Sequence, residues 1–202
     1  GDPAACERAS YPAFIKPNGG DGSSGVDSGS VVNDVAEAKR RLAELDAILP
    51  GQEVLIQEYL PGPEYTVGVI GNRATGYTVL PPLEIDFSAL DEGLPPIMTY
   101  GSKVDADSPY WRKVAFMPAR SEDACRKMTD YAGLLFERVG CRDYARMDFR
   151  TDSEGEVRLM DLNAHPMWGE GGMLPTMAGY RGQSYPRFLE SILAAARARL
   201  NL

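Results

Sequence analysis

Two alternating apolar and polar segments joined by a short turn constrain the fold of this chain more than any other feature. Residues 144–150 and 157–163 have the period of strands, and the polar residues 152–155 between them are typical of a tight turn. If Glu154 and Gly155 form a two-residue loop, Arg146 lies opposite Asn163 and Asp148 lies opposite Asp161. A four-residue loop keeps the shared face with a shifted register, and a three-residue loop would break it. We therefore expect an antiparallel hairpin.

The other predicted elements are grouped by type instead of alternating along the chain. Helical spacing of apolar residues predicts helices over 35–49, from Ser121 to a stop at Gly140, and from Ser184 onwards, with Asp34 and Glu37 as a capping pair of the first. This grouping predicts the α+β class, and the short turn signals between many of the strands predict mainly antiparallel pairing. The further expected strands are 13–16, 54–60, 65–70, 77–80 and 83–87.

The polar face of the hairpin predicts a metal site. Residues two apart on a strand share a face, as do residues directly opposed across an antiparallel pair. Two carboxylates, Asp148 and Asp161, with the amide oxygen of Asn163 form a set of hard oxygen ligands suited to Mg²⁺ that carries phosphates. The alternative is a solvated pair of strands in which Arg146 pairs with one of the acids.

A glycine-rich stretch at 17–25 is the second candidate site. Gly20, Gly22 and Gly25 match G-x-G-x-x-G, but the next helix begins only near Asp34, so a Rossmann site is excluded. The chain also has no G-x-x-x-x-G-K motif. A loop whose amides and hydroxyls fold over phosphates and a flexible surface loop both remain open.

Charge, hydropathy and cysteine content exclude several classes. The net charge of −8 and the pI near 4.8 disfavour nucleic-acid binding, and no apolar stretch reaches the roughly 18 residues of a membrane span. Three cysteines without a C-x-x-C pair indicate neither zinc nor a disulfide framework and favour the cytoplasm. We expect the single histidine, His165, to line a pocket or donate a structural hydrogen bond, and residues 167–177 to form a loop over that pocket.

Taken in order, the motifs resemble the D-alanine–D-alanine ligase branch of the ATP-grasp superfamily over about residues 11–200. The resemblance implies the ATP-grasp fold, with a lid subdomain over 1–59 and a C-terminal subdomain over 60–202 that grip the nucleotide between them. The matching segments are the lysine strand 14–17, the Gly-Ser-Ser-Gly loop 22–25, the hinge 56–67, the lysine segment 100–103, the hairpin with Arg146, Asp148, Asp161, Asn163 and Pro166, and the helix start at 184–186.

The resemblance also implies roles for single residues. Arg146 and Lys103 would be catalytic, with Arg146 stabilising the oxyanion, and Asp148, Asp161 and Asn163 would bind one or two Mg²⁺, for which Mn²⁺ substitutes. Residues implied in ATP binding are Lys16 and Lys103 at the phosphates, Ser23, Ser24 and Gly25 in the loop, Gln57, Glu58, Tyr59 and Leu60 around adenine, and Glu64 at the ribose.

Three departures from the family's pattern matter for the substrate. The acid at Asp161 is usually glutamate. Where the family has Gly-x-Thr and then a serine that receives the acceptor carboxylate, this chain has Met167, Trp168 and, near position 172, glycine. The family's N-terminal domain is absent from the chain, so we expect it in cis or in trans, and a homodimer is a further expectation.

The predicted reaction is ATP-dependent amide or peptide-like bond formation through an acyl phosphate, with ADP and phosphate released. The expected partners are ATP and small carboxylate and amine substrates. A nucleotide-binding module of a larger assembly, without ligase activity, is the alternative. A hydrolase using Asp148 and Asp161 is disfavoured because it leaves the glycine-rich loop and the lysines unexplained.

Overall fold

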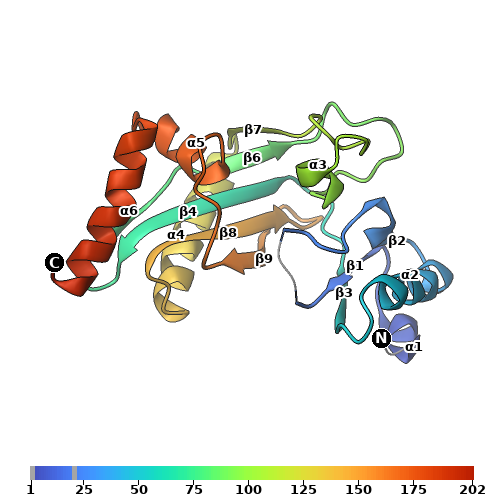
Figure 1. Ribbon diagram of the computed structural model, residues 1–202. Helices are drawn as coiled ribbons and strands as arrows, with labels where there is room; N and C mark the ends of the chain where they lie inside the picture. Colours follow the sequence, from blue (N-terminus) through green and yellow to red (C-terminus); the bar gives the residue numbers. More distant parts are fainter. Residues whose placement is uncertain (1–2, 20–21) are drawn as a thin grey trace. The chain divides into compact units, whose positions relative to one another are not determined.

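The structure is a computed structural model that describes residues 3–19 and 22–202 (Figure 1). Its contacts divide the chain into two compact units. Unit 1 comprises Gly1–Leu60 and Asp86–Ala115, and unit 2 comprises Pro61–Ile85 and Phe116–Leu202. This differs from the predicted division at 59/60, which assigned residues 86–115 to the second subdomain. Within unit 1 the Tyr100 amide donates to the Val26 carbonyl at 3.0 Å, which connects the two segments of this unit.

Unit 1 is built on a small antiparallel sheet covered by helices on one face. The strand order is β2 (Val31–Val32), β1 (Ala13–Pro17), β3 (Val54–Glu58). The helices α1 (Pro3–Arg8) and α2 (Val35–Ile48) pack on it, a 3₁₀ turn η1 (Ser28–Ser30) precedes β2, and α3 (Gly101–Val104) lies in the returning segment. The Asp34 side chain caps α2 by accepting the Glu37 amide at 2.8 Å, as predicted. The buried core is Cys6, Ala13, Ile15, Val32, Ala38, Leu42 and Leu45.

Unit 2 is a larger antiparallel sheet with helices on both faces. The strand order is β7 (Ala115–Pro118), β6 (Leu83–Asp86), β4 (Glu64–Asn72), β8 (Asp143–Thr151), β9 (Val157–Asn163), and β5 (Gly76–Val79) also pairs with β4. The helix α4 (Glu122–Arg138) covers one face, and α5 (Met173–Tyr180) and α6 (Tyr185–Leu200) cover the other (Figure 1). Every residue of β4 is buried, because this strand lies between two helical layers and pairs with three strands, β5, β6 and β8.

Alternation along the two central strands separates two apolar cores. The core under α4 contains Val67, Val69, Ala145 and Met147 of the two strands and Met128 and Phe136 of the helix. The opposite side of β4 contributes Ile70 to the core formed with α5 and α6, which includes Leu174, Met177, Phe188 and Ile192. Gly68 allows α5 to approach closely, because a Cβ there would lie 2.4 Å from Leu174 Cδ2.

The predicted hairpin is present with the two predicted pairs of polar residues, but the predicted two-residue turn is wrong. Arg146 lies opposite Asn163 and Asp148 opposite Asp161. The Asp152 amide, however, donates to the Glu156 carbonyl at 3.0 Å, so residues 153–155 form a three-residue loop. Such a loop alone would break the shared face. A β-bulge, with Met160 as its extra residue between the Asp148–Asp161 and Phe149–Leu159 pairs, restores it.

Elements that the sequence analysis missed are short or unusual. The three predicted helices are confirmed, but residues 167–177 were expected to form a loop and α5 begins at Met173 within them. The many glycines before this point suggested a loop, whereas Leu174, Met177 and Ala178 form a buried helical stripe. The elements η1, β2, α3 and β7 have two to four residues each, too few to give a periodic signal.

A half-buried ion pair joins the C-terminal helix to the central strands. Arg199 of α6 donates to both carboxylate oxygens of Asp143, at 2.7 and 2.9 Å for the shortest contacts. The side chain of Asn72 donates to Asp143 Oδ1 at 3.0 Å and to the Ala195 carbonyl at 3.0 Å. The Arg199 guanidinium, and next the Asn72 amide, lower the pKa of Asp143 against the opposing effect of desolvation. The cluster therefore stabilises the folded state when Asp143 is ionised.

We expect Asp143→Asn to lower the unfolding free energy at pH 7 by about 1.5–3 kcal/mol, because it removes a charge-assisted pair. Asparagine tolerates the positive φ of 68° at this position. Because the folded pKa lies below the ordinary 3.8, this stability is fully present above pH 3.8 and is lost as pH falls through the folded pKa. Urea unfolding at pH 7 and at decreasing pH should show the difference between variant and wild type shrinking.

The matched control is Glu190→Gln, which breaks the exposed Arg187–Glu190 pair of the same helix. That variant should change the unfolding free energy little. An Asp143→Asn effect no larger than the control's would contradict the assignment.

Candidate functional site

A row of polar pairs follows β4 and β8 on the sheet face that also carries α5 and α6. The register sets Glu64 opposite Arg150, Thr66 opposite Asp148, and Gly68 opposite Arg146. The next pair in this alternation is Ile70 with Tyr144, which belongs to the apolar core under the helices. The polar row therefore lies on the same sheet face as this apolar core. The paired strands hold the backbone of each polar residue in a fixed position.

Arg146 and Asp148 form a two-pronged ion pair at the centre of the row. Arg146 Nε donates to Asp148 Oδ1 at 2.9 Å and Nη2 donates to Oδ2 at 2.9 Å. The Thr66 hydroxyl donates to Oδ1 at 2.6 Å. The side chains are 15% and 20% exposed, so both remain accessible to a ligand. The pairing of Arg146 with one acid, left open by the sequence, is thus present, and Asp148 Oδ2 has a lone pair left beside its one bond to Arg146.

The predicted partners of Asp148 lie on the edge strand β9. Asp161 is exposed and directly opposite Asp148, and Asn163 is half-buried opposite Arg146. Asn163 Oδ1 accepts the His165 backbone amide at 2.8 Å, which fixes the start of the following loop. The structure therefore brings together Arg146, Asp148, Asp161 and Asn163 on one face.

Glu64 lies farther along the same row in a more enclosed position. Its side chain is 10% exposed and its Oε2 lies 3.3 Å from Nη1 of Arg150, which is itself 5% exposed. Arg150 Nε also donates to the Gly62 carbonyl at 2.9 Å. The carboxylate that the sequence analysis assigned to a ribose is therefore held by a buried guanidinium in this structure.

The predicted adenine and phosphate residues of β1 and β3 divide between the two faces of the small sheet. Lys16 is half-buried and lies opposite Leu55, on the face turned away from the helices, and Gln57 shares that face. Glu58 lies opposite Ala13, on the helix-covered side. Tyr59 follows the strand, and its amide donates to the Pro12 carbonyl at 3.1 Å. Leu60, the last of the predicted adenine residues, is the final residue of the first segment of unit 1.

The glycine-rich loop contacts the second predicted lysine. Lys103 Nζ, from α3, donates to the Ser23 hydroxyl at 2.8 Å. Ser24 and Gly25 are half-buried, and Gly25 has a φ of 73° with its backbone close to Pro17, where a Cβ would lie 2.8 Å from Cγ. Gly20, part of the G-x-G-x-x-G match, lies outside the described residues. Ser23 and Lys103, 80 positions apart in sequence, are thus adjacent in unit 1.

A loop with exposed aromatic side chains follows the hairpin. The ring of Tyr144 lies 6.0 Å from the rings of both His165 and Trp168, measured between centroids. The Tyr185 hydroxyl donates to the Trp168 carbonyl at 3.3 Å. Met167 is 81% exposed. His165 thus packs on an aromatic side chain, and its backbone amide makes the hydrogen bond to Asn163.

Sequence reasoning missed three residues that support the predicted ones. Thr66 binds Asp148, Arg150 binds Glu64, and Arg41 of α2 donates to the Gly25 carbonyl at 2.8 Å. Arg41 could have been found, because it occupies the apolar stripe of its helix between Ala38 and Leu45. Thr66 and Arg150 give no signal before the register of β4 against β8 is known.

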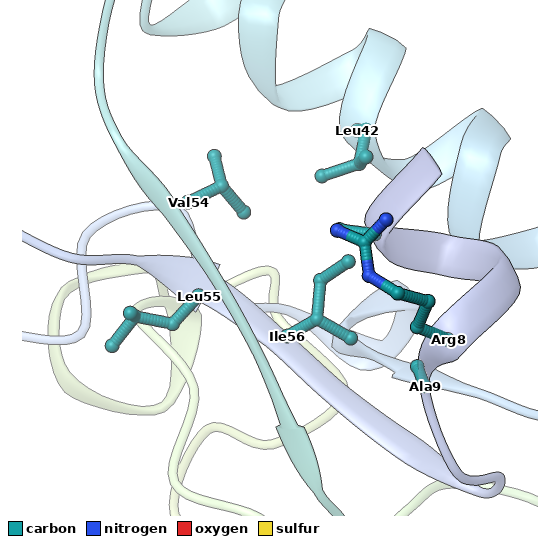
Figure 2. A pocket seen from close by; sticks show the side chains of 7 residues that line it. Arg8, Ala9, Leu42, Val54, Leu55 and Ile56 are labelled. Carbon is teal, nitrogen blue, oxygen red and sulfur yellow. The ribbon is translucent and has the colours of Figure 1, made fainter. Parts of the chain in front are cut away.

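One cavity within the described part of the chain is lined by none of the predicted site residues. A cavity of about 340 Å³ opens between α1 and β3, where the Arg8 guanidinium lies between the side chains of Leu42 and Ile56 (Figure 2). Among residues 3–19 and 22–202, no group of three or more His, Cys, Asp or Glu side chains is placed to hold a metal ion. No helix in the same part of the chain is long and apolar enough to cross a membrane.

A family model described as the D-ala D-ala ligase C-terminus matches residues 3–194. The chain belongs to this family. A D-alanine–D-alanine ligase of Actinobacillus succinogenes is 30% identical over 190 residues, which are 94% of this chain and 56% of the relative. The chain spans about half the length of the curated relatives it matches.

Solved structures support the same fold. A D-alanine–D-alanine ligase from Bacillus anthracis, complexed with ATP, superposes with a TM-score of 0.71 at 20% identity, over 96% of this chain and 56% of that one. The VanG D-Ala:D-Ser ligase from Enterococcus faecalis gives 0.70 at 19% identity, over 94% and 50%. The predicted α+β class and ATP-grasp membership are therefore confirmed.

Proposed function

We propose that the protein is an ATP-dependent ligase that joins a carboxylate to an amine. The observation that carries the proposal is the register that places Arg146, Asp148, Asp161 and Asn163 on one face. Membership of the D-ala D-ala ligase C-terminal family and the fold shared with an ATP-bound ligase support it. A structural hairpin alone has no need for two opposed acids, because like charges facing each other destabilise a sheet.

The donor set on this face fits Mg²⁺. Asp148 can offer Oδ2 without losing its pair with Arg146, and Asp161 offers an exposed carboxylate. Asn163 offers its amide oxygen. The His165 amide uses one lone pair of this oxygen, and the second lone pair is available to a metal ion. Hard oxygen ligands of this kind leave coordination positions for water and phosphate. Mg²⁺ bound here would neutralise phosphate charge during transfer.

The residues assigned to the nucleotide belong to unit 1, except Glu64, which belongs to unit 2. Lys103 and Ser23 already share a hydrogen bond and would hold phosphate oxygens together with Lys16. Backbone amides near Ser24 and Gly25 would add uncharged donors. The hinge residues 57–60 would bind adenine. Glu64 would take the ribose with its carboxylate oriented by Arg150.

In the proposed chemistry the chain supplies position and charge. The substrate carboxylate attacks the γ-phosphate of ATP to give an acyl phosphate and ADP. The amine then adds to the acyl carbon and phosphate leaves. Arg146 would stabilise the oxyanion of the tetrahedral step, and Asp148 and Thr66 hold its guanidinium in place. Lys103 would neutralise the transferred phosphoryl group.

A second candidate is a nucleotide-binding module without ligase activity. The observation that favours it is the segment after the hairpin, where Met167 is 81% exposed and a glycine precedes α5. Such a module would bind MgATP but release no ADP with any pair of carboxylate and amine. An ADP-release screen across amino-acid pairs separates the two candidates.

MgATP should bind the folded chain, and Lys103→Ala should weaken binding by about 1.5–3 kcal/mol, roughly ten- to a hundred-fold in Kd, because a charge-assisted phosphate contact is lost. Isothermal calorimetry measures both constants. Lys113→Ala, which removes a lysine that pairs with Asp91 in the same unit, is the control and should leave the Kd unchanged. Folded protein with no measurable nucleotide binding would contradict the proposal.

Asp161→Asn should abolish phosphoryl transfer and leave the fold intact. Asp161 is exposed, so the isosteric change removes a charge and little packing. ADP release is measured with the full encoded protein, which is this chain with any sequence that flanks it. Asp130→Asn, on the opposite side of the sheet in α4, is a control that should retain full activity. Unchanged turnover in Asp161→Asn would remove this residue from the site.

We expect little D-alanyl-D-alanine synthesis. Met167 and Trp168 replace the family's small turn, and Gly172 offers no hydroxyl to an acceptor carboxylate. Without that donor the desolvation of the carboxylate is uncompensated. An acceptor that is larger or differently charged, in contact with Trp168, Glu170 or His165, should be preferred. Saturable dipeptide formation from ATP and D-alanine would contradict this expectation.

A further inference from the structure

A buried guanidinium lies beneath the end of the glycine-rich loop. Arg41 of α2 is 4% exposed and occupies the helix stripe that packs on the small sheet. Its Nη2 donates to the Gly25 carbonyl at 2.8 Å and to the Ser30 hydroxyl at 3.2 Å. Its Nη1 lies 3.1 Å from Asp27 Oδ2 and 3.2 Å from Glu44 Oε2.

Packing does not explain an arginine at this position. Burying a charge is costly unless it is paired and hydrogen-bonded, and Arg41 Nε has no hydrogen-bond partner within the described part of the chain. An apolar side chain on this stripe would avoid that cost. What the guanidinium adds is a rigid fork of donors. Three of its four bonded groups, on Gly25, Asp27 and Ser30, belong to the segment that leaves the loop.

The bonded groups control where the loop ends. Asp27 caps η1 by accepting the Gly29 amide at 2.8 Å, and the Ser23 carbonyl accepts the Val26 amide at 2.9 Å. A side chain that holds Gly25 and Asp27 therefore fixes both neighbours of Val26. Ser23, whose hydroxyl contacts Lys103, lies at the other end of this turn.

We propose that Arg41 is a positioning residue for phosphate binding. It does not touch the nucleotide. It holds the Gly25 carbonyl and the Asp27 carboxylate so that the amides and hydroxyls of Ser23 and Ser24 are presented in one arrangement. This inference rests on the proposed function, because the ligand of the loop is taken to be a nucleotide. Whether Arg41 anchors the loop can be measured without any ligand.

The test compares Arg41→Leu and Arg41→Lys with Arg40→Leu, a control on the same helix whose arginine is 67% exposed. Hydrogen exchange of the Ser23–Val26 amides is measured without nucleotide, and the Kd values of MgATP and adenosine are measured by calorimetry. We expect Arg41→Leu to speed exchange in this turn and to raise the Kd of MgATP at least ten-fold, with adenosine unchanged. Arg41→Lys should be intermediate, because it keeps the charge and loses the fork.

Each outcome decides a separate point. Folded Arg41→Leu with wild-type exchange and wild-type MgATP affinity overturns the proposal, as does an equal loss for adenosine and MgATP. If Arg41→Leu does not fold, Arg41→Lys decides by the same two readouts. If the wild type binds no nucleotide, the proposed function fails. In that case accelerated exchange in Arg41→Leu but not in Arg40→Leu still establishes the anchor.

Discussion

The antiparallel pairing of β4 with β8 is the constraint on which the rest of unit 2 depends. Eight consecutive pairs, from Glu64–Arg150 to Gly71–Asp143, fix which side chains face α4 and which face α5 and α6. A slip of one residue would move Val67, Met147 and their neighbours out of the core and turn the polar row into it. The same register therefore specifies the fold and the candidate site. The pairing that buries the apolar side chains under α4 also brings the polar side chains together on the opposite face.

Both predicted catalytic cations have partners within their own units. Arg146 is paired with Asp148, and Lys103 with the Ser23 hydroxyl. These contacts hold the two charged groups in place and leave both of them partly exposed. Oriented, partly solvated charges are what a phosphate site needs, because little reorganisation remains when the ligand arrives. The support comes from Thr66 and Arg41, residues that need not meet the ligand.

Much of this arrangement could be predicted from sequence, and the hairpin shows the limit. The opposition of Asp148 to Asp161 was predicted from a two-residue turn, and it exists because a three-residue turn is followed by a bulge at Met160. Two local features that each shift the side-chain alternation cancel, and no periodic pattern reports a single bulge. Long amphipathic helices such as α4 were predicted because their signal repeats over several turns. The helix α5 was missed because glycines precede its short apolar stripe.

The candidate site was predictable where residues lie on one hairpin and not where support comes from distant segments. Arg146 and Asp148 share a face by alternation along β8, and Asp161 and Asn163 share one along β9. The bond between Thr66 and Asp148 spans 82 positions, and that between Arg41 and Gly25 joins a helix to a loop. Contacts of this kind depend on tertiary packing, which local propensity and residue spacing do not predict.

We propose that one face of the β8–β9 hairpin binds the metal ion that accompanies the phosphates of ATP. The test is paramagnetic broadening by Mn²⁺ in backbone amide spectra of the folded protein, recorded with ATP present. We expect the amides around Asp148, Asp161 and Asn163 to broaden first, and Asp161→Asn to remove the effect. Broadening that spares this hairpin, or that persists unchanged in the variant, would show that the metal ion binds elsewhere.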